Sequence, residues 1–253
     1  MTGLLTALGA SVTRLRSIVE GFEPDQLRAH AYPAEWSVAD VLSHVGSAGV
    51  IMLAHLDAGL AGRDLPGDLA QSVWDEWNAK DPDAKAADAL VVDRAFLDRV
   101  AALDANDQAR VRVTMGPITF DLTGLLRARL NEHALHTWDV EVVLDPNATL
   151  PSDAAAFVVE NLEMIVRYVG KPDGTEREIA IRTFDPERDF ILSFGKDSLA
   201  LAPAPSEPRR APDLGLPAEA FARLVYGRLD PDHTPPVRGA ADLDDLRRAF
   251  PGV

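Results

Sequence analysis

The stretch DLTGLLRARLNEHALHTWDVEVVL, residues 121–144, predicts one uninterrupted helix around which the rest of the chain is organised. Four ionisable residues follow one another along it at spacings of three, four and three positions: Arg129, Glu132, His136 and Asp139. At about 100° per residue, their side chains fall within an arc of roughly 80° and share one face of the helix. Glu132 and His136 lie one turn apart, a separation at which two side chains can bind one metal ion. A metal site would need a third ligand from elsewhere in the chain.

Composition narrows the classes of function. The chain has 253 residues, enough for two domains that each bury a core, and its net charge is −15. The surplus of acidic residues repels phosphate backbones and anionic lipids, so we expect neither nucleic-acid binding nor a membrane-surface role. Residues 1–22 carry apolar residues at helical spacing, without the charged start and cleavage site of a signal peptide, which favours a cytoplasmic protein.

The absence of cysteine restricts the chemistry of any site. A chain without cysteine has no disulfides, no thiolate zinc ligands and no sulfur nucleophile of its own. Metal ligands must therefore be histidines and carboxylates. The chain has six histidines, so the search for the third ligand is short.

Among these histidines, His44 is the best placed to complete the site. It lies on a predicted helix over residues 38–60, which begins with Ser37 as its N-cap and Asp40 three residues later, a short-acid form of the capping box. Two histidines and one glutamate leave a coordination position open, which is typical of a catalytic rather than a structural zinc site.

The same pattern allows other interpretations. A Glu–His pair one turn apart is also common on solvated helix faces. His133 competes as a ligand because it lies three residues before His136, but it points about 100° away from Glu132, so we favour Glu132. The position before Glu132 is Asn131, which makes the HExxH motif of zincin proteases an unsuitable description.

Four further residues are candidates for the surroundings of the metal. Asp139 and Arg129 would orient a ligand or hold a substrate carboxylate. Asn78 and His55, on neighbouring helical segments, would line a pocket, although both positions also suit a purely structural role.

The apolar residues change their period in the second half of the chain. Before residue 148 they follow helical stripes, with further helices expected at 73–78 and 86–103, then a polar loop and an extended arm at 110–114. A helix at 151–169 follows, and from residue 179 onward apolar and polar residues alternate, as in strands.

This change predicts a multi-domain α+β protein. Residues 1–148 would form a helical bundle and residues 149–253 a small α+β domain with an antiparallel sheet, of which 149–173 is a linking helix.

Three segments carry a resemblance to a known family: WSVADVLSH at residues 36–44, RLNEHALHTWDV at 129–140 and LVYGRL at 224–229. The first two resemble the signatures of the DinB-like, mycothiol-dependent maleylpyruvate isomerase superfamily, the second of which is R-x-x-E-x-x-x-H-x-x-D. The third is similar to part of that family's small C-terminal domain, so the likeness extends over nearly the whole chain. The resemblance implies that the N-terminal domain is a DinB-like four-helix bundle.

The resemblance also implies a site and a reaction. In the family, the residues that match His44, Glu132 and His136 bind zinc, and the low-molecular-weight thiol mycothiol supplies a nucleophilic sulfur. We therefore expect Zn²⁺, or another divalent metal, and mycothiol as cofactors. Thiolate addition, bond rotation and elimination would isomerise a maleylpyruvate-like substrate from cis to trans, and the same sulfur could be transferred to another electrophile. Arg228, from the C-terminal domain, and Arg129 are the candidates for a functional arginine.

Two other functions stay open at the level of sequence. The chain could be a non-catalytic metal-binding or regulatory module, or a metal-dependent hydrolase in which water takes the open position and Asp139 serves as general base. For the thiol-dependent enzyme we expect a small electrophilic molecule as the partner, catalytic groups from both domains, and a monomer or homodimer.

Overall fold

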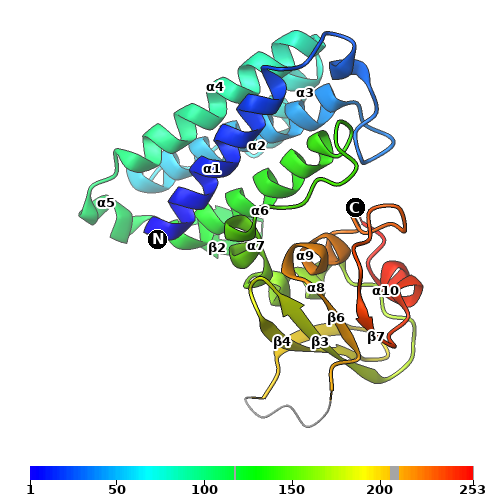
Figure 1. Cartoon of the computed structure of the whole chain (residues 1–253). Coiled ribbons are helices and arrows are strands. Elements are labelled where there is room, and N and C mark those ends of the chain that lie inside the picture. Colours follow the sequence, from blue (N-terminus) through cyan, green and yellow to red (C-terminus); the bar gives the residue numbers. More distant parts are fainter. Residues whose placement is uncertain (117, 206–210, 253) are drawn as a thin grey trace. The chain divides into compact units, whose positions relative to one another are not determined.

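The protein divides into two compact units, Met1–Ala148 and Thr149–Val253. The computed structural model describes residues 1–116, 118–205 and 211–252. Within these residues it contains ten α-helices and a sheet that includes antiparallel strands, which confirms the mixed α+β class. Each unit has its own set of packed elements (Figure 1).

The first unit is mainly helical. Its elements, in order, are α1 (Thr2–Val19), a 3₁₀ turn (Gln26–Arg28), α2 (Val38–Ala61), α3 (Leu69–Asn78), α4 (Pro82–Ala101), α5 (Ala105–Arg110), β1 (Val113–Met115), β2 (Ile118–Phe120) and α6 (Leu122–Glu141). Helix α2 packs against α3, α4 and α6, while α1 packs against α4 and α6. Helices α2 and α6 therefore both lie in the interior of this unit.

The start of α2 follows from its capping residues. The Ser37 hydroxyl accepts a hydrogen bond from the Asp40 N–H, and the Asp40 carboxylate accepts one from the Ser37 N–H, so the predicted capping box is confirmed. The helix ends at Gly62, which adopts the left-handed conformation that favours glycine. By length and composition α2 would also suit a membrane span, but 56% of its most apolar window is buried inside the structure, as in the core helix of a soluble protein.

Close packing around α2 depends on a residue without a side chain. Gly46 faces the indole of Trp77 from α3, and a methyl group at this position would overlap the ring. Trp77 is 3% exposed and belongs to the apolar core formed mainly by α1, α2, α3 and α4. The glycine lets α3 approach α2 closely enough to bury this large ring.

Three predicted boundaries in the first unit are corrected. The third long helix begins at Pro82 rather than residue 86, because the Asp81 side chain caps it and proline suits the first helical turn. The predicted polar loop after it contains α5, which Asp104 caps. The extended arm is confined to β1, which pairs antiparallel with β2.

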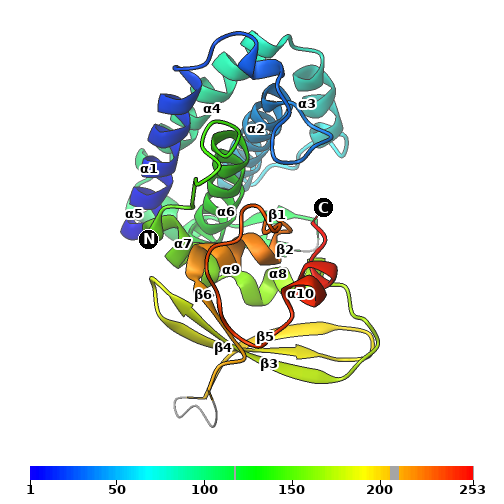
Figure 2. The same cartoon turned by 45° about the vertical axis from the view of Figure 1, so that its right-hand side comes forward.

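The second unit combines a five-stranded sheet with helices. Its elements are α7 (Ser152–Val159), α8 (Leu162–Val169), β3 (Arg177–Phe184), β4 (Arg188–Phe194), β5 (Leu199–Pro203), β6 (Leu214–Pro217), α9 (Ala218–Val225), β7 (Arg238–Gly239) and α10 (Leu243–Ala249). The strand order is β5-β4-β3-β6-β7, and α8 and α9 lie on one face of the sheet (Figure 2). Ile181 pairs with Phe190 in the β3–β4 register, and both side chains are buried beneath these helices.

Two features of the second unit differ from the prediction. The expected single helix at 151–169 is two helices, because α7 packs against α9 whereas α8 packs against β5. The sheet is antiparallel between β3, β4 and β5, but β6 pairs parallel with β3. Strand β6 has only four residues and ends in a proline, so its sequence carries too little alternation to predict it.

Replacement of Gly46 by alanine tests the packing of α2. The added methyl group must displace the buried Trp77 ring, so we expect the free energy of unfolding to fall by about 1–3 kcal/mol. Gly9→Ala is the matched control: Gly9 also lies within a helix, but a methyl group there meets no atom within 4 Å. Alanine should raise stability there by about 0.5–1 kcal/mol. Urea unfolding followed by tryptophan fluorescence measures both, and equal effects would refute the packing argument.

Candidate metal centre

The candidate metal centre lies where α2 meets α6. His44 of α2 places Nε2 3.1 Å from Oε2 of Glu132, and Nε2 of His136 lies 3.6 Å from the same oxygen. One ligand atom from each of these three residues lies within 4.8 Å of the other two. Among the described residues, this is the one cluster of three or more histidine or carboxylate side chains arranged to hold a metal ion.

The spacing and chemistry of this cluster fit a divalent ion. Zinc binds imidazole nitrogen and carboxylate oxygen at about 2.0–2.2 Å, which places tetrahedral ligand atoms roughly 3.4 Å apart. The two distances to Glu132 lie close to that value, so small side-chain shifts would bring the donors around one ion. Two imidazoles and one carboxylate also suit other first-row divalent metals.

His136 is held in one orientation by a buried carboxylate. Its Nδ1 lies 2.8 Å from Oδ2 of Asp139, whose side chain is fully buried. If Nδ1 carries the proton and donates it to this carboxylate, the lone pair of Nε2 points toward Glu132. Metal-binding histidines commonly have such a partner, which fixes the tautomer and raises the basicity of the ligand.

The Glu132 carboxyl is held in its ionised form. Partial burial would raise its pKa, but hydrogen bonds with His136 and His44 outweigh that effect and lower the pKa below its ordinary value. The group therefore carries its negative charge at neutral pH, as a metal ligand must. Its side chain is 40% exposed and that of His44 is 34% exposed, so the cluster is open to small molecules from one side.

A cavity of about 310 Å³ adjoins His44. Its lining residues come from α2, α3 and the segment before α2: Trp36, Asp40, His44, Ser47, Trp74 and Asn78. The Trp36 ring lies 5.5 Å from the His44 imidazole and 6.2 Å from that of His136, measured between ring centroids. The structure thus places Asn78 in the lining of the cavity that adjoins His44, whereas His55 does not line this cavity; burial lowers the pKa of His55.

The negative charge in this cavity is already compensated. Asp40 accepts a hydrogen bond from Nζ of Lys85 at 2.8 Å, and Lys85 is buried. Burial raises the pKa of Asp40, but its bonds with Lys85 and Ser37 lower it more. Asp40 therefore remains ionised, and its charge is balanced by Lys85.

Arg129 and His133 lie in the interior rather than beside the cavity. Arg129 is 1% exposed and donates to Oδ1 of Asp93 at 2.5 Å and to the Val45 carbonyl at 2.9 Å. His133 is fully buried between Ser11, 2.8 Å from its Nδ1, and Asp93, 3.0 Å from its Nε2. These partners account for the buried charge of Arg129 without a substrate. The partners of His133 direct its ring away from Glu132.

Arg228 belongs to the second unit, where it follows α9. It is 8% exposed, and its Nη1 donates to the Tyr226 carbonyl at 2.9 Å. The nearby Arg223 is almost fully buried and forms two hydrogen bonds with Glu219, which is a structural ion pair that the sequence analysis did not anticipate.

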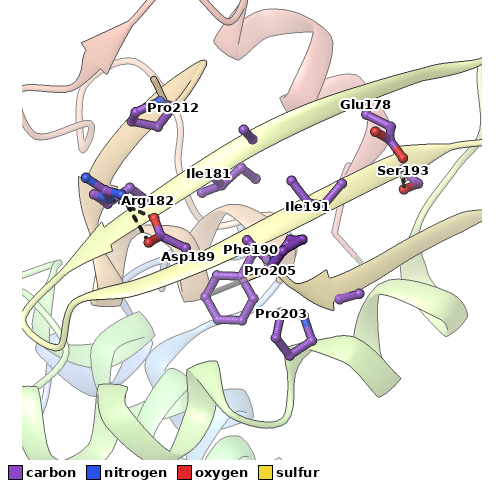
Figure 3. A pocket seen from close by; sticks show the side chains of 13 residues that line it. Glu178, Ile181, Arg182, Asp189, Phe190, Ile191, Ser193, Pro203, Pro205 and Pro212 are labelled. Carbon is purple, nitrogen blue, oxygen red and sulfur yellow. Dashed lines mark hydrogen bonds and ion pairs between the residues drawn. The ribbon is translucent and has the colours of Figure 1, made fainter. Parts of the chain in front are cut away.

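The second unit carries a larger cavity, of about 560 Å³, over β3, β4 and β5 (Figure 3). Its charged groups bind each other: Arg182 donates to both carboxylate oxygens of Asp189, at 2.7 and 3.1 Å. At the other end Ser193 lies 3.4 Å from Glu178. This cavity has neither a histidine nor a metal-binding cluster among its described residues, so it is a weaker candidate for chemistry.

Sequence reasoning missed two parts of the site. Trp36 is not among the predicted site residues, yet its ring lies near both imidazoles; its place in the WSVADVLSH segment was the available signal. The burial of Asp93 could not be predicted, because the sequence around it does not distinguish this carboxylate from the solvent-exposed acidic residues of the same helix. Its partners Arg129 and His133 lie far along the chain.

Comparisons with known proteins identify the family of the first unit. Residues 8–141, slightly more than half of the chain, match the family model described as the mycothiol maleylpyruvate isomerase N-terminal domain. This range includes all three residues of the cluster.

Two solved structures share the fold. One is the crystal structure of the mycothiol-dependent maleylpyruvate isomerase, with 14% sequence identity and a TM-score of 0.66, covering 89% of this chain and 88% of that chain. The other is a mutant of that isomerase, with 13% identity and the same TM-score and coverage. At these identities the likeness shows the fold alone. No curated protein sequence matched the chain.

Alanine substitutions test the ligand assignment. We expect the protein to bind about one Zn²⁺ per chain, and His44→Ala, Glu132→Ala and His136→Ala each to remove most of it, because each deletes one of three donors. Metal content after dialysis, measured by inductively coupled plasma mass spectrometry, gives the answer. Asp139→Asn should keep the three donors but weaken Zn²⁺ affinity about 10- to 100-fold, because it removes the carboxylate that orients His136.

The control is His133→Ala, which removes a neighbouring histidine that contacts Ser11 and Asp93 rather than Glu132. Folded His133→Ala protein should retain its metal. A protein that loses its metal with His133→Ala and keeps it with Glu132→Ala would show that the ligand set is wrong.

Proposed function

Because the chain belongs to the mycothiol maleylpyruvate isomerase N-terminal domain family, we propose that it is a metal-dependent enzyme that uses a low-molecular-weight thiol, mycothiol, as its nucleophile. The proposed reaction is cis–trans isomerisation of a maleylpyruvate-like substrate, with S-transfer to an electrophile as the variant of the same chemistry. The observation that supports it most is the cluster of His44, Glu132 and His136, brought together from two helices beside a cavity.

Residues of the first unit have distinct parts in this proposal. His44, Glu132 and His136 would hold Zn²⁺ or another divalent ion, and Asp139 keeps His136 in the orientation for binding. A divalent ion bound there would favour the ionised form of a thiol at neutral pH, and the thiol would supply the sulfur that the cysteine-free chain lacks.

The cavity beside His44 would receive the small molecules. Trp36 and Trp74 give it two aromatic walls, and Asn78 and Ser47 supply an amide and a hydroxyl for hydrogen bonds. The aromatic walls offer apolar surface to a small organic ligand, and the polar groups can fix its orientation. An anionic substrate would in addition need a cation, and Arg228 remains our prediction for that role from the family resemblance.

The two alternative functions have less support. A hydrolase needs a general base near the open coordination position, but Asp139 is fully buried against His136 and is placed to orient that ligand instead. A purely regulatory metal-binding module has no need of the cavity that adjoins His44.

The remaining parts of the proposal rest on sequence. We propose that the packed helices of the first unit are a DinB-like four-helix bundle, and that the protein is cytoplasmic and acts as a monomer or homodimer. Its partner would be a small electrophilic molecule rather than nucleic acid or a membrane, in keeping with the net charge of −15.

Thiol dependence tests the proposed function. Zinc-loaded protein should convert maleylpyruvate to its trans isomer only when mycothiol is added, because the chain has no sulfur nucleophile of its own. Proton NMR of the vinyl signals follows the conversion, and a panel of epoxides and alkyl halides tests S-conjugate formation. Metal content should be the same with and without the thiol.

Asn78→Ala is the companion variant, because it changes the cavity without touching the metal cluster. We expect lower turnover with unchanged metal content. Full activity in thiol-free buffer would contradict the proposal and favour the hydrolase. A metal-loaded protein inert toward every electrophile would favour the regulatory module.

A further inference from the structure

We infer that Arg129 is a positioning residue: together with Asp93 it sets α6 against α2 so that Glu132 and His136 face His44. This inference deepens the proposed function, since it concerns how the metal centre is preorganised. It rests on three hydrogen bonds made by Arg129 and Asp93 and on one glycine, all within the first unit.

Arg129 joins the two helices that supply the ligands. Its own helix, α6, carries Glu132 one turn further along, and its Nη1 donates at 2.9 Å to the carbonyl of Val45, the residue next to His44 in α2. A carbonyl inside a helix already accepts a bond from its own helix, so this second bond is a specific link between α6 and α2. At one end of this link, Val45 is adjacent to the ligand His44. At the other end, Arg129 lies three residues before the ligand Glu132.

Asp93 fixes Arg129 and α6 from the opposite side. Its Oδ1 accepts a hydrogen bond from Nη2 of Arg129 at 2.5 Å, and its Oδ2 lies 3.0 Å from Nε2 of His133, which is one turn further along α6. The Asp93 side chain is fully buried; burial would raise its pKa, but His133 and Arg129 lower it more. Both contacts restrict the rotation of α6 about its axis, and the further bond of Arg129 to the Val45 carbonyl holds α6 to α2 even without His133.

His133 extends the anchor to a third helix. Its Nδ1 lies 2.8 Å from the Ser11 hydroxyl of α1, and Thr137 donates to the His133 carbonyl at 2.7 Å. The buried polar side chains of α6 thus divide into two sets. Arg129 and His133 bind α4, α2 and α1, while the metal-binding set meets His44.

Gly49 provides the space that Arg129 occupies. A Cβ atom at this position of α2 would lie 3.1 Å from Nη2 of Arg129 and 2.6 Å from Cγ1 of Val92. The glycine lies five residues after His44, on the helix that supplies this ligand. The glycine therefore leaves room beside α2 for both the Val92 side chain and the Arg129 guanidinium.

The contrasting explanation is that the contacts among Arg129, Asp93 and His133 only stabilise the fold. Removing one partner of a buried ion pair leaves an uncompensated charge and destabilises a protein wherever the pair lies. A loss of stability therefore cannot distinguish the two explanations. The distinguishing quantity is the Zn²⁺ affinity of protein that is still folded.

The experiment compares two glycines of α2. Gly49→Ala crowds Val92 at 2.6 Å and Arg129 at 3.1 Å, whereas Gly59→Ala crowds the Arg112 carbonyl at 2.5 Å and is ten residues further along the same helix. Both variants strain α2, but only the first disturbs the arginine. Zn²⁺ affinity is measured by competition with a chromophoric chelator, at a temperature where circular dichroism shows each variant to be folded. Arg129→Met is the direct variant.

We expect Gly49→Ala and Arg129→Met to weaken Zn²⁺ binding about 10- to 100-fold, the range found when groups that orient metal ligands are removed. Gly59→Ala should bind Zn²⁺ like the unsubstituted protein. The d–d spectrum of Co²⁺-loaded Arg129→Met should also change shape, which reports altered ligand geometry rather than fewer folded molecules. Equal affinities for Gly49→Ala and Gly59→Ala, or an unchanged Co²⁺ spectrum, would overturn the inference.

Hydrogen exchange of metal-free protein separates this inference from the proposed function. Arg129→Met should speed amide exchange around residues 42–49 and 129–136 more than Gly59→Ala does, because the link between these segments is lost. If the unsubstituted protein binds no metal, the proposed function is wrong. The amide hydrogen exchange of metal-free protein still shows whether Arg129 positions α6. Unchanged exchange in these two segments would contradict the positioning role even in a metal-binding protein.

Discussion

The contact between α2 and α6 is the interaction on which the site depends. It brings Nε2 of His44 to 3.1 Å from Glu132, across 88 positions of sequence. Neither helix can form a three-residue cluster alone, because α6 offers two ligands one turn apart and α2 offers one. Polar groups removed from water must find partners, so every buried ionisable side chain on α6 restricts how that helix can lie against its neighbours.

This restriction explains how an acidic chain holds charges in its interior. The buried Arg129 has Asp93, Lys85 has Asp40, and in the second unit Arg223 has Glu219. Each of these three interior cations thus has a carboxylate partner. Such pairs contribute little net stability compared with apolar packing, but they are strongly selective for one arrangement, because a displaced helix would leave charges unpaired. In the first unit, the pair of Arg129 and Asp93 favours one position of α6, the helix that supplies Glu132 and His136.

Much of this arrangement could be predicted from sequence wherever a local pattern carried the information. The capping box at Ser37 and the stripe on residues 121–144 each lie within one helix, and the mixed α+β class follows from the change of period. The break between α7 and α8 and the parallel strand β6 could not be predicted, because packing against different partners decides them. The role of Asp93 was hidden for the same reason, so the sequence could predict that Arg129 orients a ligand or holds a substrate carboxylate, but not which residue it binds.

X-ray absorption spectroscopy of the zinc-loaded protein tests the central claim most directly. Because the chain lacks cysteine, a sulfur at thiolate distance in the metal's first shell would have to come from the added thiol. The proposed site predicts two imidazole nitrogens and a carboxylate oxygen at about 2.0–2.2 Å, and a new sulfur neighbour at about 2.3 Å after mycothiol is added. A shell of oxygen atoms alone, or a shell that does not change when the thiol is added, would contradict it.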